Sequence, residues 1–117
     1  MKILFLGDVV GISGCSKIKK DLLNQIEKNK INFVIVNGEN ADETGVGLTK
    51  EICENFFECG VDVITTGNHV WDQKDLMKFI ENENRLLRPK NLFEPAPGKG
   101  FEIYKTKNNI KIGVLNL

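Results

Sequence analysis

The stretch VDVITTGNHVWD, residues 61–72, joins a short apolar run to a polar corner and then to a segment with helical periodicity. Residues 61–64 are mostly β-branched, which is typical of a strand buried in a parallel sheet. The corner contains the only histidine of the chain, His69, directly after Gly67 and Asn68. A strand, a glycine corner and a helix in this order predict one unit of an α/β sheet.

The same unit occurs twice earlier in the chain. Residues 2–6 and 32–36 are nearly continuous in apolar character and predict two further strands buried on both faces. After each strand, in 16–29 and in 49–60, apolar residues recur at helical spacing and predict an amphipathic helix. Strands alternating with helices favour right-handed crossovers and parallel pairing.

The ends of the helices carry recognisable signals. Thr49 is placed to cap the second helix and Gly60 to end it. Asp72 is expected to cap a third helix. The apolar residues of that third helix are Leu76, Met77, Phe79 and Ile80.

The chain changes character after Pro89. The proline-containing stretch LFEPAPGKG interrupts regular structure, and residues 101–117 predict two strands joined around Asn108–Asn109. The predicted fold class is therefore α/β, a layered structure with a mostly parallel sheet and a C-terminal hairpin. A length of 117 residues predicts a single domain that spans 1–117.

The composition excludes several classes of function. Sixteen basic and sixteen acidic residues cancel, so no net field favours DNA, RNA or an anionic membrane as a partner. We find no signal peptide and no apolar run long enough to cross a membrane. Cys15, Cys53 and Cys59 lack metal-site spacing and are expected to be free thiols in a reducing cytoplasm.

Polar residues follow each of the three early strands. Asp8 follows the first strand, Glu39 and Asn40 follow the second, and Asn68 and His69 follow the third. Parallel strands bring their carboxyl ends to one edge of a sheet, where open α/β sheets bind ligands. We therefore expect two carboxylates, two amides and one imidazole to face the same crevice.

This combination of side chains suits a metal site. Carboxylate and amide oxygens bind hard divalent cations, and a cation would relieve the repulsion between Asp8 and Glu39. Bound metals lower the pKa of water, and a neighbouring histidine can protonate a leaving alkoxide. Each corner taken alone fits an ordinary turn, but three corners on one edge favour a functional site. The glycines of GVGLT, residues 45–49, favour a plain connecting loop over a phosphate site.

The stretches LGDVVG, VNGENA with the following GVGLT, TTGNHVWD and the tail IGVLNL resemble the YmdB-like subfamily of calcineurin-like metallophosphoesterases. The resemblance implies an α/β/β/α sandwich that hydrolyses phosphodiesters of the 2′,3′-cyclic AMP type. It also implies two metal ions, iron or manganese, with magnesium and zinc as alternatives. Asp8 and Asn40 would bind one metal, Asn68 the other, and Glu39 both; His69 would donate the proton.

The chain is shorter than the members of this subfamily. Members of the subfamily are more than twice as long, so the resemblance covers only the N-terminal half of their domain. We expect an incomplete ligand set, weak or no activity, and an exposed sheet edge that favours a homo-oligomer. The alternative is a non-catalytic α/β module that binds a nucleotide or a protein and self-associates through that edge.

Overall fold

Four short strands form a parallel sheet in the computed structural model, which describes residues 1–117. In spatial order the strands are β1 (Ile3–Leu6), β2 (Phe33–Asn37), β3 (Val63–Thr65) and β4 (Leu86–Leu87). Phe5 lies opposite Ile35, which in turn lies opposite Val63. Each strand pairs with the next one along the chain, so β1 is an edge strand.

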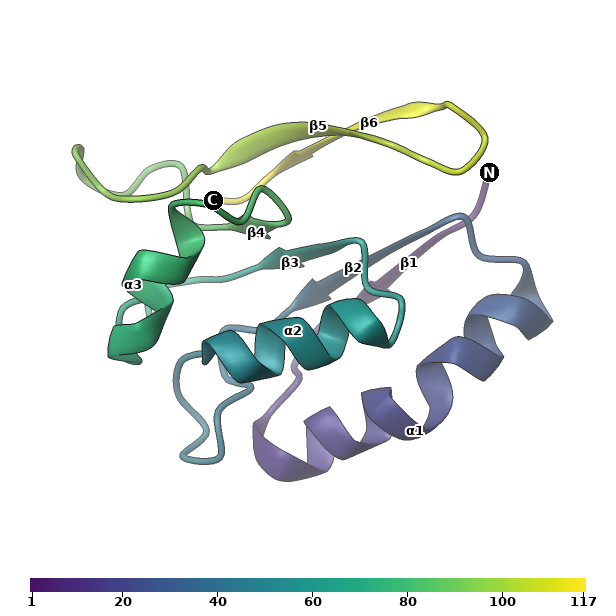
Figure 1. Ribbon diagram of the computed structural model, residues 1–117, viewed down its shortest axis with the longest axis horizontal. Helices are drawn as coiled ribbons and strands as arrows, with labels where there is room; N and C mark the ends of the chain where they lie inside the picture. Colours follow the sequence, from purple (N-terminus) through teal and green to yellow (C-terminus); the bar gives the residue numbers. More distant parts are fainter.

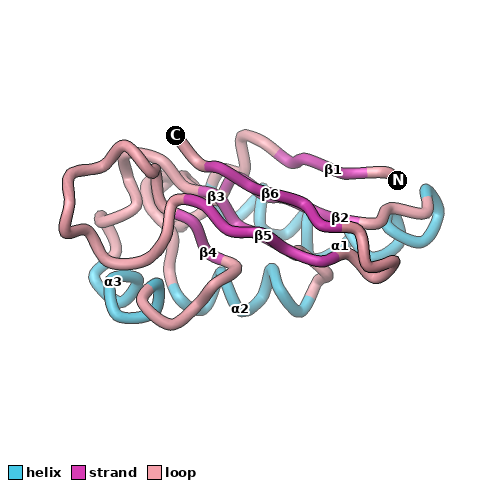
Figure 2. Tube along the Cα trace, turned by 90° about the horizontal axis from the view of Figure 1, so that it is seen from above, coloured by secondary structure: helices cyan, strands magenta, loops and turns pink.

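The two faces of the sheet are covered by different elements. The helices are α1 (Gly11–Asn29), α2 (Lys50–Glu58) and α3 (Lys74–Ile80), and the hairpin consists of β5 (Phe101–Lys105) and β6 (Lys111–Leu115). The helices α1 and α2 lie on one side of the sheet and the antiparallel hairpin on the other (Figure 1). Seen from above, the hairpin lies over the middle of the sheet, and β1 lies beside it (Figure 2).

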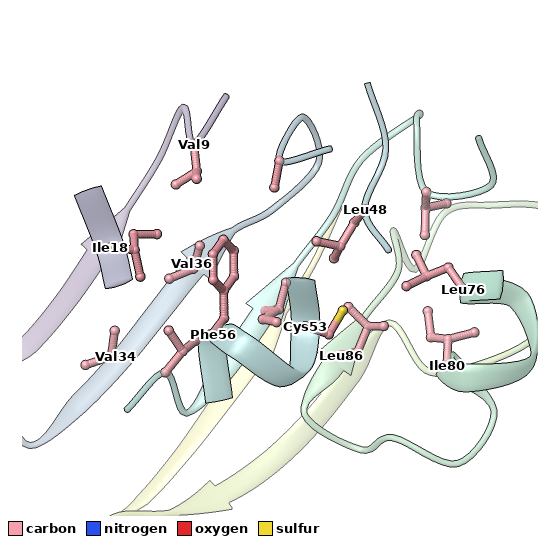
Figure 3. Close-up of a cluster of buried hydrophobic side chains, with 14 of the residues drawn as sticks. Val9, Ile18, Val34, Val36, Leu48, Cys53, Phe56, Leu76, Ile80 and Leu86 are labelled. Carbon is pink, nitrogen blue, oxygen red and sulfur yellow. The ribbon is translucent and has the colours of Figure 1, made fainter. Parts of the chain in front are cut away.

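The apolar core has two parts. The larger cluster contains fifteen buried residues between the helices and the sheet. Figure 3 shows its side chains, such as Phe56 of α2 and Val36 of β2, gathered between the two layers. The smaller cluster, under the hairpin, consists of Phe33, Val63, Leu87, Ile112 and Val114. Burial of these side chains holds both layers to the sheet.

Several predicted features are confirmed. The element order and the parallel pairing agree with the sequence analysis. The Thr49 side chain accepts a hydrogen bond from the Ile52 amide at 3.2 Å, and Gly60, with φ +94°, follows the end of α2. The hairpin turns at Asn109, which has φ +60°. All three cysteines are free, and burial raises the pKa of the Cys53 thiol.

Other expectations were wrong. The first helix begins at Gly11, five residues before the predicted stretch 16–29, and the Gly11 amide donates outside the helix to the Asn40 carbonyl. Asp72 does not cap α3; Gln73 occupies that position without a side-chain cap. Strand β4 was missed because a two-residue strand has no periodicity.

Burial of β1 on both faces was also wrong. Ile3 is 46% exposed and Phe5 59%, because the hairpin does not extend over the outermost strand. The opposite face of β1 carries Leu4 and Leu6, which pack against the larger core cluster. The structure contains no helix with the length and apolar character of a membrane span.

Arg88 stabilises residues 89–97, the segment that leads from the parallel sheet to the hairpin. Its side chain is 3% exposed, and its guanidinium donates to the Glu94 carboxylate at 3.1 Å. It also donates to three backbone carbonyl groups, those of Pro89, Ala96 and Pro97. One side chain therefore holds four acceptors of this segment together.

Replacing Arg88 with Met should lower the free energy of unfolding by about 1–3 kcal/mol, because buried carbonyl groups lose their donor. Urea unfolding followed by circular dichroism measures the change. The control is Lys90→Met, since Lys90 is exposed and only 3.7 Å from the same carboxylate of Glu94. Equal effects of the two substitutions would contradict the anchoring role of Arg88.

Candidate functional site

Three corners at the carboxyl ends of β1, β2 and β3 carry the predicted site residues. The first corner holds Asp8, the second Glu39 and Asn40, and the third Asn68 and His69. The three strands run in the same direction (Figure 1), so all three corners lie at the same edge of the sheet. This arrangement is the one that the sequence predicts.

The first and second corners are joined through the backbone. Val10 forms an isolated parallel bridge with Asn40, and the Gly11 amide donates to the Asn40 carbonyl at 3.0 Å. Asp8 has φ +55°, a left-handed conformation that is uncommon for residues other than glycine. This turn takes the chain from the end of β1 to the bridge at Val10 and leaves the Asp8 side chain exposed.

The second and third corners are joined through the Glu39 side chain. A Cβ atom placed on Gly67 would lie 2.2 Å from Cδ of Glu39, so the carboxylate occupies the space that any other residue would fill. The His69 amide points to Oε1 of Glu39 at 3.4 Å. The Gly38 amide donates to the Thr65 carbonyl at 2.9 Å and holds the two corners together. The Glu39 carboxylate is thus placed beside the peptide of Asn68.

The four predicted metal ligands offer oxygen atoms that other side chains do not occupy. Neither Asp8 nor Glu39 forms an ion pair. The four side chains together form a single hydrogen bond, in which the His69 amide donates to Glu39. Oxygen donors of this kind suit a hard cation. No three histidine, cysteine, aspartate or glutamate side chains form a group that could hold a metal ion.

His69 has a hydrogen-bond partner, Asp72, that was not predicted from the sequence. Its Nδ1 lies 2.8 Å from Oδ2 of Asp72, and both side chains are partly exposed. The Asp72 amide donates to the His69 carbonyl at 3.2 Å, so the two residues span one tight turn. The spacing of three residues directly after a strand was the available signal, but we interpreted Asp72 as a helix cap.

The sequence of the chain matches a known protein family. The family model of YmdB-like proteins matches residues 4–117. The chain belongs to the YmdB-like family.

Two of the proteins that the chain resembles bear names that point to phosphoester chemistry. The chain is 44% identical, over its whole length, to a protein of Bacillus subtilis (strain 168) named 2′,3′-cyclic-nucleotide 2′-phosphodiesterase. A solved structure described as a novel phosphatase from Mycoplasma pneumoniae matches all of the chain with a TM-score of 0.88 and 37% identity. The solved structure of a protein from Thermus thermophilus matches 98% of it, with a TM-score of 0.88 and 33% identity.

These similar proteins are longer than this chain. The chain spans 44% of the Bacillus subtilis protein, 42% of the Mycoplasma pneumoniae chain and 44% of the Thermus thermophilus chain. The matched part contains all three corners, so the arrangement described above belongs to the region that these proteins share.

Replacing Gly67 with Ala should displace the Glu39 carboxylate and destabilise the chain modestly, because the new methyl group takes its space while the end of a flexible side chain can move away. We expect the loss to shrink by about 0.5–3 kcal/mol when Glu39 is also replaced by Ala, since residues in contact couple by such amounts. A double-mutant cycle by urea unfolding measures this coupling. The matched control is Gly7→Ala, whose Cβ would meet only the edge of the Phe5 ring at 3.7 Å. Additive effects of Gly67→Ala and Glu39→Ala would contradict the contact.

Proposed function

We propose that this chain carries the proton donor and part of the metal site of a phosphodiesterase that opens 2′,3′-cyclic nucleotides. The observation that carries the proposal is the Glu39 carboxylate, which lies against Gly67 between the second and third corners. This contact brings a carboxylate next to the only histidine of the chain. The name of the Bacillus subtilis relative, 44% identical, supports this class of substrate.

The metal ligands we propose are those of the three corners. Asp8 and Asn40 would hold one ion, Asn68 a second, and Glu39 would contact both. Iron or manganese fits a site that mixes oxygen donors with a nearby imidazole, and magnesium and zinc are alternatives. When bound, such ions polarise the phosphoryl oxygens and activate water. Because the four side chains do not fill two coordination spheres, further ligands must come from other residues or from solvent.

Glu39 and His69 would have different roles in the reaction. Glu39, whose carboxylate lies against Gly67, would place a carboxylate between the two ions. His69 would act as the general acid. Opening the cyclic diester forms one bond between phosphorus and the oxygen of a water molecule, which gives up a proton to solvent, and breaks one bond between phosphorus and a ribose oxygen. That oxygen leaves as an alkoxide, which accepts the proton of His69 and becomes a hydroxyl group.

Self-association through the sheet edge is a second candidate role, and the exposure of β1 favours it. The outer edge of β1 has no neighbouring strand, and Ile3 and Phe5 are 46% and 59% exposed on its hairpin side. An unpaired strand with apolar side chains is a template for pairing with another chain. In a non-catalytic module, this edge would bind a second copy while the corners bind a nucleotide or a protein.

Metal binding tests the first proposal directly. The chain, stripped with a chelator and reloaded with Mn²⁺, should retain the metal after gel filtration. Glu39→Gln should weaken metal binding at least tenfold, because the substitution removes the central negative charge. Glu43→Gln is the matched control, since Glu43 is exposed and not a predicted ligand. Manganese retention by Glu39→Gln at the level of the unmodified chain would contradict the site.

His69→Ala should behave differently from Glu39→Gln. In a version extended to the length of the relatives, we expect turnover of 2′,3′-cyclic AMP to fall by about 10²–10⁴-fold, the usual contribution of general acid–base catalysis. Metal content, measured on the same sample by elemental analysis, should stay unchanged. Turnover that survives the loss of His69 would remove its role as the acid while leaving the metal site intact.

For the second candidate, sedimentation equilibrium should show a dimer or a larger oligomer at micromolar concentration. Phe5→Lys should shift the chain to the monomer, because a charge on the apolar edge opposes pairing. The control is Phe93→Lys, since Phe93 is 92% exposed in the loop before the hairpin. A chain that is monomeric over the whole concentration range would exclude this role.

A further inference from the structure

The carboxylate of Asp72 is hydrogen-bonded to the His69 ring. Oδ2 of Asp72 lies 2.8 Å from Nδ1 of His69, and no basic side chain competes for it. Because both side chains are 37–40% exposed, the pair contributes little to stability. The carboxylate also does not cap α3, whose first residue is Lys74. A structural role therefore accounts poorly for this contact.

The loop of residues 45–47 holds Asp72 in place. Gly47 has φ +84°, and a Cβ there would lie 3.2 Å from Cβ of Asp72 and 3.4 Å from the His69 carbonyl oxygen. Nε2 of Gln73 donates to the Val46 carbonyl at 3.2 Å. The loop and the His69 turn are thus packed as closely as the absence of a side chain on Gly47 allows.

The same loop is tied to the second corner. The Gly47 amide donates to the Glu39 carbonyl at 2.7 Å, and the Asp42 amide donates to the Gly47 carbonyl at 3.0 Å. The backbone of Glu39, the loop and Asp72 therefore form one continuous set of contacts. This set fixes the imidazole of His69 relative to the corner that carries Glu39.

We propose that Asp72 is the positioning residue of His69, an inference that rests on the proposed phosphodiesterase function. Asp72 accepts the hydrogen bond of Nδ1–H, and this contact leaves Nε2–H as the proton to be transferred. In the step, the N–H bond at Nε2 breaks and its electron pair stays on the ring nitrogen. The proton forms an O–H bond with the departing ribose oxygen. Nδ1 keeps its proton and its bond to Asp72 throughout.

Two substrates with different leaving groups distinguish a positioning role of Asp72 from a general disturbance of the site. The ribose alkoxide of 2′,3′-cyclic AMP needs a proton, whereas the p-nitrophenolate of bis(p-nitrophenyl) phosphate leaves without one. With the manganese-loaded chain, Asp72→Ala should lower kcat for the cyclic nucleotide by about 10–100-fold, the loss that follows when the hydrogen-bond partner of a metal-bound histidine is removed. KM for the cyclic nucleotide and the rate with the nitrophenyl ester should change less than about twofold.

Two further variants complete the kinetic test. Asp72→Asn should restore part of kcat, because its side-chain oxygen still accepts from Nδ1–H. Glu81→Ala, an exposed acidic residue at the end of α3, should match the unmodified chain with both substrates. Equal losses with the two substrates in Asp72→Ala, or no loss with either, would overturn the positioning role. If the unmodified chain hydrolyses neither substrate because its ligand set is incomplete, the tautomer of His69 alone decides the positioning role, and manganese retention decides the metal site.

A spectroscopic readout tests the contact without any turnover. Because His69 is the only histidine, its ring nitrogens give a single set of signals in long-range ¹H–¹⁵N spectra. In mildly alkaline buffer the neutral ring of the metal-free chain should carry its proton on Nδ1. Asp72→Ala should shift the proton toward Nε2, and Asp72→Asn should keep it on Nδ1. The same tautomer in the unmodified chain and in Asp72→Ala would overturn the inference.

Discussion

Parallel pairing of β1, β2 and β3 is the constraint on which the candidate site depends. Leu6 lies opposite Val36, and Val36 lies opposite Ile64, so the three strands end close to the same level of the sheet. After each strand the backbone turns within a few residues, and backbone hydrogen bonds of Asn40 and Gly38 join the corners to one another. A shift of one strand by a single residue would turn its side chains to the opposite face and separate these contacts.

The corner contacts show how a small site can be held with few side chains. Glu39 is long enough to reach from the second corner to the third, and Gly67 has no side chain to oppose it. Gly47 allows the same close approach between the 45–47 loop and the turn that holds His69 and Asp72. Two glycines thus permit the contacts that place a carboxylate and an imidazole at neighbouring positions.

Coverage of the sheet explains both the stability and the exposed surface of the chain. The helices cover one face of the sheet, whereas the hairpin covers only β2, β3 and β4 on the other face. The edge strand β1 therefore exposes Ile3 and Phe5 and at the same time carries Asp8 at its end. Any partner that covers β1 would approach the first corner of the site, so the two proposed roles concern adjoining surfaces.

The sequence by itself determined the features that depend on neighbouring residues. The order of strands and helices, the Thr49 cap and the turn at Asn109 follow from apolar spacing and local backbone preference. The composition of the corners was predictable for the same reason. Only the tertiary structure decided the contact of Glu39 with Gly67, the exposure of β1 and the hydrogen bond between Asp72 and His69. These depend on where distant segments come to lie, and no short window of sequence contains that information.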